Sequence, residues 1–281
     1  MPVINFLTTT IFDHGAIGQL GRTLTGFAVS RPMIITDPGI KAVGLLDTVL
    51  ENLGGAAERI SSFPALAAGG QTIGDFYVLA IACTGAPNAS HLSSVPGLPD
   101  SAFLSDGQIT KRDVRATTLA KLAPYPGALL WDVGAGCGSV GIEWMRAARD
   151  AKTIAFEKHQ DRLAFIEANR QALGTPALQI VAGDARHTIA SAPSPDAIFL
   201  GGDVANRQLF DACWAALRPF GRLVANAVTL DAEKALIERQ ARYGGELTRV
   251  AISVLDQIGD ERIFRPRLSV TQWFVTKGET S

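Results

Sequence analysis

The sequence has few cysteines and no long apolar segment. Its three cysteines, Cys83, Cys137 and Cys213, are far apart and form no Cys-x-x-Cys pair. Such a set favours reduced thiols over disulfides and predicts no structural metal site. No run approaches the roughly 18 to 20 apolar residues of a membrane-spanning helix, and the first residues lack the basic start of a signal peptide. We therefore expect a cytoplasmic protein with no membrane partner.

Net charge is also nearly absent. The chain has 26 Lys and Arg against 27 Asp and Glu, a formal charge of −1. This balance gives no global attraction for nucleic acid, and we expect no nucleic-acid partner. Apolar residues, in contrast, make up 47% of the 281 residues. That is enough to bury a full α/β core together with a second, smaller module.

The composition changes near residue 100. Before it lie the loop-like runs FPALAAGGQTIGD and SSVPGLPDS, and after it apolar strand-like runs alternate with helical patterns. The strand-like runs lie at 128–133, 152–156, 178–182, 196–200 and 221–226. This alternation predicts a doubly wound, Rossmann-like α/β fold with buried parallel strands.

Two further patterns complete the predicted fold. Residues 204–217 repeat apolar side chains at steps of three and four and stop at Arg218-Pro219, which predicts a helix. The segments LTRVAISVLDQ and LSVTQWFVTK both resemble strands with no strong helix between them, which predicts an antiparallel C-terminal strand pair. Added to the parallel runs, this pair gives a mostly parallel seven-stranded sheet.

The strongest local signal is LLWDVGAGCGSVGIEWM, an apolar strand that leads into a glycine turn and a helix from Ser139. Glycines let the backbone approach a ligand, and a helix start presents unpaired amides. The G-x-G-x-G spacing is shorter than the G-x-G-x-x-G/A of dinucleotide-binding folds, which favours S-adenosylmethionine over NAD. The candidate cofactor contacts in this turn are Gly134, Ala135, Gly136, Cys137 and Gly138.

Three other positions point to the same ligand. Glu157 ends the second strand, where a carboxylate can accept hydrogen bonds from a ribose diol. Asp184 and Ala185 follow the third strand, where the side chain and backbone could serve the amino group and ring nitrogen of adenine. In GQITKRDVRATTLAKL, Thr110 is predicted as a helix N-cap, with Asp113 in the first turn. That pattern also fits an ordinary helix start without a ligand.

These motifs resemble class I methyltransferases, and residues 98–277 resemble the C-terminal half of the precorrin-6Y C5,15-methyltransferases. The segments that carry the resemblance are LPDSAFLSDGQITKRDVRA, LLWDVGAGCGSVGIEWMRA, DAIFLGGDVAN, GRLVANAVTL and SVTQWF. The resemblance implies S-adenosylmethionine as cofactor, with contacts from Thr110, the glycine turn, Glu157 and Ala185. It implies a precorrin substrate in cobalamin biosynthesis, methylated at C15 with loss of the C12 acetate carboxyl as carbon dioxide. It also implies a homotetramer, and we expect this chain to perform only the C15 half of the reaction.

A polycarboxylate substrate calls for forked cationic donors. The candidates for binding it are Lys111, Arg112, Arg115, Arg262, Arg265 and Arg267, each of which also fits a solvated charged surface. Methyl transfer needs positioning and exclusion of water rather than a dedicated nucleophile, so the catalytic residue stays unknown. His187 and Asn226 are candidates for assisting proton movement, although a structural role also fits His187.

One position departs from the family pattern. After IFLGG the family continues with a small residue or glycine, whereas this chain has Asp203. A carboxylate there would repel a polyacidic substrate unless it points away. A fusion protein that binds ligand without turnover therefore stays open as an alternative, as does an NAD-binding oxidoreductase.

The first 99 residues show two further resemblances. Residues 72–98 resemble the last strand and linker of a tetrapyrrole methylase half, and residues 3–55 resemble the start of iron-containing alcohol dehydrogenases. The glycine loop and iron ligands of that second family are not found, so His14 and Asp37 are interpreted as structural. The predicted organisation is a dehydrogenase-like α/β fragment at 1–60, a linker with a methylase tail at 61–99, and a methyltransferase domain at 100–277.

Overall fold

The computed structural model describes residues 33–35, 59–61, 79–81 and 92–278. The chain divides into two compact units, residues 1–91 and 92–281. In the first unit, three short strands pair in parallel in the order β2-β1-β3: β1 (Met33–Ile35), β2 (Arg59–Ser61) and β3 (Leu79–Ile81). The predictions for His14, Asp37 and Cys83 lie outside the described residues, and the two family resemblances of this unit stay predictions.

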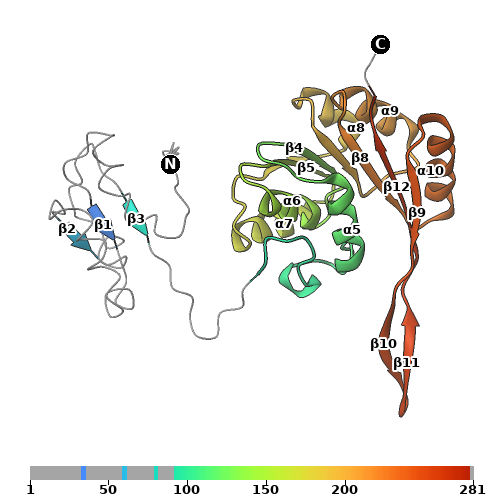
Figure 1. The fold of residues 1–281 in the computed structure, drawn as a ribbon, viewed down its shortest axis with the longest axis horizontal. Helices are drawn as coiled ribbons and strands as arrows, with labels where there is room; N and C mark the ends of the chain where they lie inside the picture. Colours follow the sequence, from blue (N-terminus) through green and yellow to red (C-terminus); the bar gives the residue numbers. More distant parts are fainter. Residues whose placement is uncertain (1–32, 36–58, 62–78, 82–91, 279–281) are drawn as a thin grey trace. The chain divides into compact units, whose positions relative to one another are not determined.

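The second unit is built on a seven-stranded sheet with the order β6-β5-β4-β7-β8-β12-β9 (Figure 1). Its first five strands along the chain are parallel, and β12 runs antiparallel to both of its neighbours. The strands are β4 (Leu129–Val133), β5 (Lys152–Glu157), β6 (Gln179–Ala182), β7 (Ala197–Leu200), β8 (Arg222–Ala227), β9 (Glu246–Val250) and β12 (Val270–Thr276). The predicted parallel strands and the closing antiparallel pair are confirmed.

Alternate side chains of the central strands enter two different cores. On β4, Trp131 and Val133 pack with side chains of α9 and α10, whereas Leu130 packs with side chains of α5 and α6. This alternation follows from the two-residue period of a strand that is covered by helices on both faces. The helices are α5 (Arg112–Leu122), α6 (Ser139–Ala147), α7 (Gln160–Ala172), α8 (Ala185–Thr188), α9 (Arg207–Ala216) and α10 (Leu230–Tyr243), with short 3₁₀ turns η2 (Asp100–Ala102) and η3 (Ile189–Ser191). Across the described part of the chain, none of the helices combines the length and apolar character that crossing a bilayer would require.

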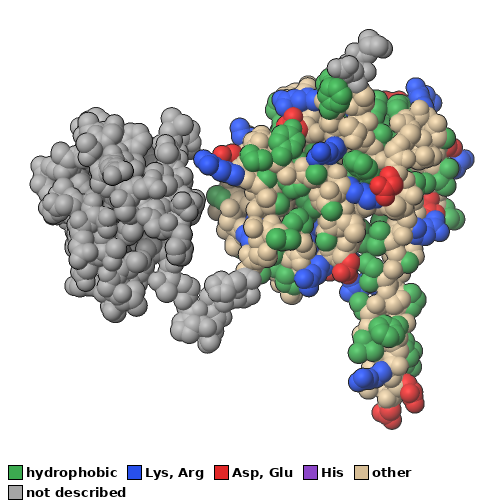
Figure 2. Space-filling model, viewed as in Figure 1, with side chains coloured by type: hydrophobic (Ala, Val, Ile, Leu, Met, Phe, Trp, Pro, Cys, Tyr) green, Lys and Arg blue, Asp and Glu red, His purple; other side chains and the backbone are tan. Residues whose placement is uncertain are grey.

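A hairpin that the sequence did not predict connects β9 to β12 along the chain and projects away from the sheet (Figure 1). It consists of β10 (Ser253–Ile258) and β11 (Glu261–Pro266) in antiparallel register. The predicted single strand LTRVAISVLDQ is therefore divided between β9 and β10. Apolar side chains lie along the hairpin and acidic ones at its tip (Figure 2). Leu255 and Phe264, which face each other across the two strands, are 59% and 74% exposed.

Candidate functional site

A cleft of about 690 Å³ lies at the edge of the sheet where the parallel strands end. Ligand sites of open α/β sheets occur at this edge. Five parts of the chain form its walls: the segment that leads into α5, the β4–α6 turn, Arg162 on α7, the ends of β7 and β8, and the end of β9 with the start of β12. The predicted site residues that line it are Thr110, Lys111, Gly134, Ala135, Gly136, Cys137, Asn226 and Arg267.

The glycine turn has a conformation that only glycine adopts easily. Gly134 has a φ of +72°, and a Cβ added to it would lie 2.8 Å from the backbone nitrogen of Gly202, in the loop after β7. Side chains are strained at such φ values, and here there is also no space for one. The next strand holds the turn, because the amides of Gly134 and Ala135 both donate to the Phe156 carbonyl, at 3.0 and 3.1 Å. The turn therefore brings two loops into close contact beside the cleft.

Helix α6 begins directly after the turn, as predicted. Gly138 is its N-cap in the left-handed conformation, and Ser139 and Val140 line the cleft. The N-terminus of α6 therefore faces the cleft with its positive end, as expected for a site that binds a polar ligand.

Glu157 lies beneath the glycine turn rather than in the cleft lining. Its carboxylate is 3% exposed and accepts from three backbone amides. Oε2 accepts from Gly136 at 2.8 Å, and Oε1 accepts from Lys158 at 3.0 Å and His159 at 2.9 Å. Each carboxylate oxygen has about two acceptor positions, so Oε2 retains one for a ligand.

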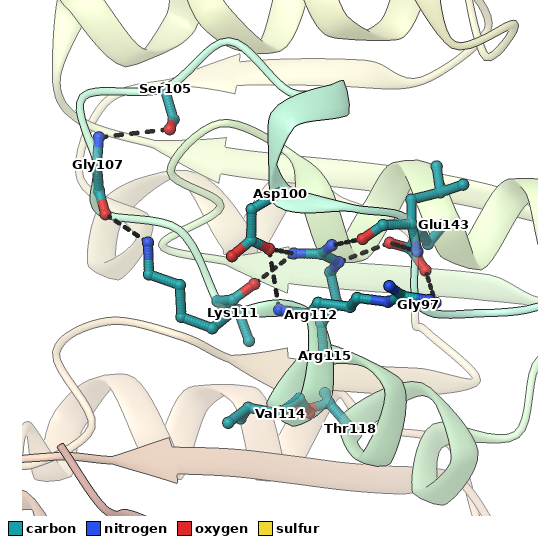
Figure 3. Close-up of polar contacts among 12 residues, drawn as sticks. Gly97, Asp100, Ser105, Gly107, Lys111, Arg112, Val114, Arg115, Thr118 and Glu143 are labelled. Carbon is teal, nitrogen blue, oxygen red and sulfur yellow. Dashed lines mark hydrogen bonds and ion pairs between the residues drawn. The ribbon is translucent and has the colours of Figure 1, made fainter. Parts of the chain in front are cut away.

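Arg115 is a structural hub, which contradicts its predicted role in binding substrate directly. Its side chain is 0% exposed, and its Nε donates to Glu143 Oε1 at 2.6 Å (Figure 3). The other guanidinium donors reach Asp100 Oδ1 at 3.2 Å and the carbonyl oxygens of Thr110 and Leu98. Glu143 in turn accepts from the Leu98 amide at 3.1 Å. Arg115 therefore holds the segment that leads into α5 and leaves no exposed donor for a substrate.

Thr110 is not the N-cap of α5, so that prediction was wrong by one residue. Lys111 occupies the cap position without a capping side chain. The first helical amide, that of Arg112, instead donates to Asp100 Oδ1 at 2.9 Å. A carboxylate from twelve residues upstream thus does the work of a local cap. Thr110 remains in the cleft wall, and Asp113 lies in the first turn as predicted.

The predicted adenine contacts do not line the cleft. Asp184 caps α8 by accepting from the Arg186 amide at 2.9 Å, and it pairs with the Arg186 guanidinium. The hydrogen bonds from Arg186 hold the pKa of the Asp184 carboxyl well below its usual range. Ala185 packs against the core. His187 is exposed on α8 and does not belong to the cleft lining, and its expected role in proton movement stays a prediction.

The predicted substrate-binding cations are dispersed. Lys111 and Arg267 line the cleft, whereas Arg112 is exposed on α5 outside the lining. Arg262 and Arg265 lie on the projecting hairpin, where Arg265 pairs with Asp256. Within this one chain, only two of the six predicted cations therefore meet at the cleft.

Asp203 does not face the cleft. Its carboxylate pairs with the Lys158 ammonium at 3.0 Å, and both side chains are about half exposed. Because its charge is compensated and it is not part of the lining, Asp203 places no free carboxylate beside a ligand. The observation that most favoured an impaired protein is thereby removed.

Several lining residues were missed by sequence reasoning. Arg162 of α7 and Gln108 both line the cleft. The Arg162 guanidinium donates to Gln108 Oε1 at 2.6 Å and to Asp106 Oδ2 at 2.9 Å. Its position in the first turn of the helix after Glu157 was a signal that could have identified it. The other missed residues are Ile109, Val114, Ser139, Val140, Phe199, Gly201, Val228, Val250, Ile252, Leu268 and Val270.

Two buried titratable groups lie beside the turn. Burial raises the pKa of Asp132 to about 7, against the opposing effect of the Gly141 amide, which donates to Oδ2 at 2.9 Å. Burial also raises the pKa of the Cys137 thiol. Cys137 is therefore held as a neutral thiol, which is a poor nucleophile. No group of three or more His, Cys, Asp or Glu side chains in the described ranges is placed to hold a metal ion.

Comparison with known proteins shows which family this chain belongs to. Residues 101–277 match the model of a precorrin methyltransferase domain. The chain belongs to the precorrin methyltransferase family. The matched range includes every strand of the seven-stranded sheet and every residue that lines the cleft. The predicted resemblance and the class I methyltransferase fold are thus confirmed.

Two relatives and one crystal structure show how far the similarity extends along this chain. A precorrin-6Y C(5,15)-methyltransferase [decarboxylating] from Sinorhizobium sp. is 44% identical over 231 residues, which cover 82% of this chain and 56% of that protein. A cobalt-precorrin-6B C(15)-methyltransferase (decarboxylating) from Salmonella typhimurium is 30% identical over 60% of this chain and 90% of that protein. The crystal structure of the C-terminal domain of precorrin-6Y C5,15-methyltransferase from Rhodobacter capsulatus is 42% identical, covers 66% of this chain and 100% of that one, and has a TM-score of 0.63. This chain therefore spans about half the length of the Sinorhizobium relative.

Proposed function

We propose that this chain methylates a precorrin at C15, with S-adenosylmethionine as methyl donor, and releases the C12 acetate carboxyl as carbon dioxide in cobalamin biosynthesis. The observation that carries the proposal is the near-complete match to the Salmonella relative, whose name specifies a decarboxylating C15-methyltransferase. That match spans 175 residues and 90% of the relative, a length close to that of the family domain at 101–277, which supports the proposal that residues 100–277 carry the C15 chemistry. C5 methylation is then the task of a different domain or protein.

The glycine turn fits an adenosyl cofactor. The absence of a side chain at Gly134 lets the turn lie against the loop after β7, and the α6 N-terminus opens onto the cleft. Glu157 Oε2 retains an acceptor position beside Gly136 for a ribose hydroxyl. S-adenosylmethionine supplies an electrophilic methyl group when bound. The proposed contacts are Thr110, Gly134, Ala135, Gly136, Cys137, Gly138 and Glu157, together with Asp184 and Ala185, which lie outside the cleft lining and would meet only the adenine end of the cofactor.

The cleft also fits a large ring with acidic side chains. Lys111, Arg162 and Arg267 bring cationic side chains to a lining that is otherwise mainly apolar, and of these Arg162 already pairs with Asp106 at 2.9 Å. Guanidinium groups suit carboxylates, and apolar walls suit the faces of a macrocycle. The residues then act by orienting the acceptor carbon and excluding water.

The first test is titration of the purified chain with S-adenosylhomocysteine and, separately, with NAD. We expect binding of S-adenosylhomocysteine only, and weaker binding after Glu157→Ala because a ribose acceptor is lost. Glu167→Ala, on an exposed part of α7, is the matched control and should change nothing. Turnover is then followed by mass spectrometry, which should show one added methyl group and one lost carbon dioxide per tetrapyrrole. NAD binding would support the oxidoreductase alternative instead, and binding without turnover would support the impaired-fusion alternative.

Three other proposals concern the protein as a whole. We propose that it works in the cytoplasm, and that it assembles as a homotetramer through the apolar β10–β11 hairpin. The alignment with the Sinorhizobium relative covers 82% of the chain, more than residues 101–281 could provide. This supports the proposal that residues 61–99 derive from the methylase half that precedes the domain.

A further inference from the structure

A network of three polar side chains lies beneath one wall of the cleft. Thr118 on α5 and Gln272 on β12 are both 0% exposed, and Asn226 near the end of β8 lines the cleft. Asn226 and Gln272 are opposite each other in the β8–β12 pair. Gln272 Oε1 is buried without a partner among the described residues, so the orientation of the network rests on the contacts among the three side chains themselves.

The single hydroxyl proton of Thr118 decides the orientation of both carboxamides. Thr118 Oγ1 donates it to the carbonyl oxygen of Val114, at 2.8 Å, one turn earlier on α5 (Figure 3). With that proton used, both amide groups must donate to Oγ1, and Asn226 Nδ2 and Gln272 Nε2 do so at 3.0 and 2.9 Å. A hydroxyl has one donor and two acceptor positions, so Thr118 is saturated.

The remaining contacts show what Asn226 offers to a ligand. Gln272 Nε2 gives its second hydrogen to Asn226 Oδ1, at 3.0 Å. One of the two acceptor positions of the Asn226 carboxamide oxygen is thus filled from within the protein. The second hydrogen of Asn226 Nδ2 finds no acceptor in the part of the chain that the structure describes. At the cleft, Asn226 therefore presents an N–H donor.

We propose that Asn226 is a specificity-determining residue that donates a hydrogen bond to a carboxylate oxygen of a ligand in the cleft. Thr118 and Gln272 are positioning residues, because they prevent the flip that would present the amide oxygen instead. The inference rests on the proposed function, under which two ligands bring carboxylates: the tetrapyrrole and the methionine part of the cofactor. Asn226 was predicted to assist proton movement, but a carboxamide held in this way orients a ligand and carries no proton.

Asn226→Asp in the full-length chain is the direct test, because it keeps the shape and replaces the donor with an acceptor. Two arms separate the sources of the carboxylate: titration with S-adenosylhomocysteine, and KM and kcat for the tetrapyrrole. We expect one ligand to lose affinity about tenfold or more. A weaker S-adenosylhomocysteine complex assigns the carboxylate to the cofactor, and a raised KM alone assigns it to the tetrapyrrole.

The pH profile separates donation from a structural role. The introduced carboxyl can donate once it is protonated, so the lost affinity should recover as the pH falls, whereas a variant that is merely distorted would show no such recovery. Thr118→Val removes the orienting hydroxyl and should weaken the same ligand, while Thr118→Ser keeps the hydroxyl and should preserve binding. This pair also tests the proposal if Asn226→Asp fails to fold.

Two results would overturn the inference in different ways. If wild type turns over normally and Asn226→Asp equals it in both arms at every pH, the donor role of Asn226 is wrong and the proposed function stands. If wild type binds neither ligand, the proposed function fails and the inference fails with it.

Discussion

Among single residues, Asp132 has the largest consequence for pH dependence. Its carboxyl is 0% exposed, Oδ2 accepts from Gly141, and Oδ1 is buried without a partner among the described residues. Burial raises its pKa from 3.8 to about 7. Between these two pH values the folded chain holds a proton that the unfolded chain releases. Stability contributed by this proton is therefore complete at low pH and is lost as the pH rises toward 7.

Asp132→Asn should remove this dependence, because the amide is neutral at every pH and its oxygen can still accept from Gly141. We expect the free energy of unfolding of the variant, relative to wild type, to gain roughly 2–3 kcal/mol between pH 5 and pH 8. Urea unfolding at several pH values measures this difference. The test is how this difference in unfolding free energy changes with pH, not its absolute value. The absolute value also includes the cost of the new NH₂ group, which needs a partner. Parallel pH curves for the two proteins would refute the prediction.

Arg115 provides a test of a buried ion pair. Arg115→Met leaves Glu143 buried beside the Leu98 amide without its cation and frees the carbonyl oxygen of Thr110. We expect a loss of about 3–5 kcal/mol in the free energy of unfolding, because an uncompensated buried charge is strongly unfavourable. Arg112→Met, on an exposed side chain of the same helix, is the matched control and should stay within about 0.5 kcal/mol. Equal losses in urea unfolding would show that Arg115 is not the hub of this segment.

The candidate site could be predicted from sequence where its signal is local. The glycine spacing identified a turn that lines the cleft, and Glu157 could be placed because it ends a strand next to that turn. The role of Arg115 could not, since it depends on Glu143, which is 28 residues away in sequence and on another helix. For the same reason, the Thr110 cap was misplaced: Asp100 satisfies the helix from a distance that no local pattern reveals.

At the scale of elements, the contact between the β4–α6 turn and the loop after β7 can be tested directly. Gly134→Ala adds a Cβ that would lie 2.8 Å from the Gly202 nitrogen, at a φ of +72°. We expect the two loops to move apart and the affinity for S-adenosylhomocysteine, measured by calorimetry, to fall about tenfold or more. A side chain at a positive φ is also strained without any steric contact, so a control variant must measure that strain by itself.

Gly174→Ala is that control. Gly174 follows α7 with a φ of +76°, and a Cβ there would meet nothing within 4 Å. Left-handed strain alone should lower stability by about 1–2 kcal/mol and leave ligand affinity unchanged. If both variants bind S-adenosylhomocysteine like wild type, the close approach of the two loops has no role in forming the site.

The elements themselves were predictable to different degrees. The five parallel strands and α9 were found because each has an apolar run or an apolar helical face that a covered sheet requires. The hairpin was missed because most of its residues are exposed on both faces, so charged and apolar side chains mix without a two-residue period. Its pairing depends on the turn at Gly259 and on register, not on burial.

At the scale of the whole molecule, the hairpin stands out because nothing in the described part of a single chain covers its large apolar side chains. Leu255, Ile258 and Phe264 are each more than half exposed, and Leu255 pairs with Phe264 across the strands. Leu255 and Phe264 share one face of the hairpin and Ile258 lies on the other, and large exposed apolar side chains gathered in this way mark interaction sites. A symmetric assembly would cover such hairpins with one another, because each copy presents the same surface.

Replacing both Leu255 and Phe264 by serine should therefore dissociate the proposed tetramer. We expect the mass measured by light scattering to fall to that of a single 29.7 kDa chain. At constant protein concentration, the urea midpoint for unfolding of the α/β core should fall only by the stabilisation that assembly adds to the wild type. Leu230→Ser, at an 83% exposed position at the start of α10, is the matched control and should leave the assembly intact. An unchanged mass in the double variant, or a monomeric wild type, would show that the hairpin does not hold copies of this chain together.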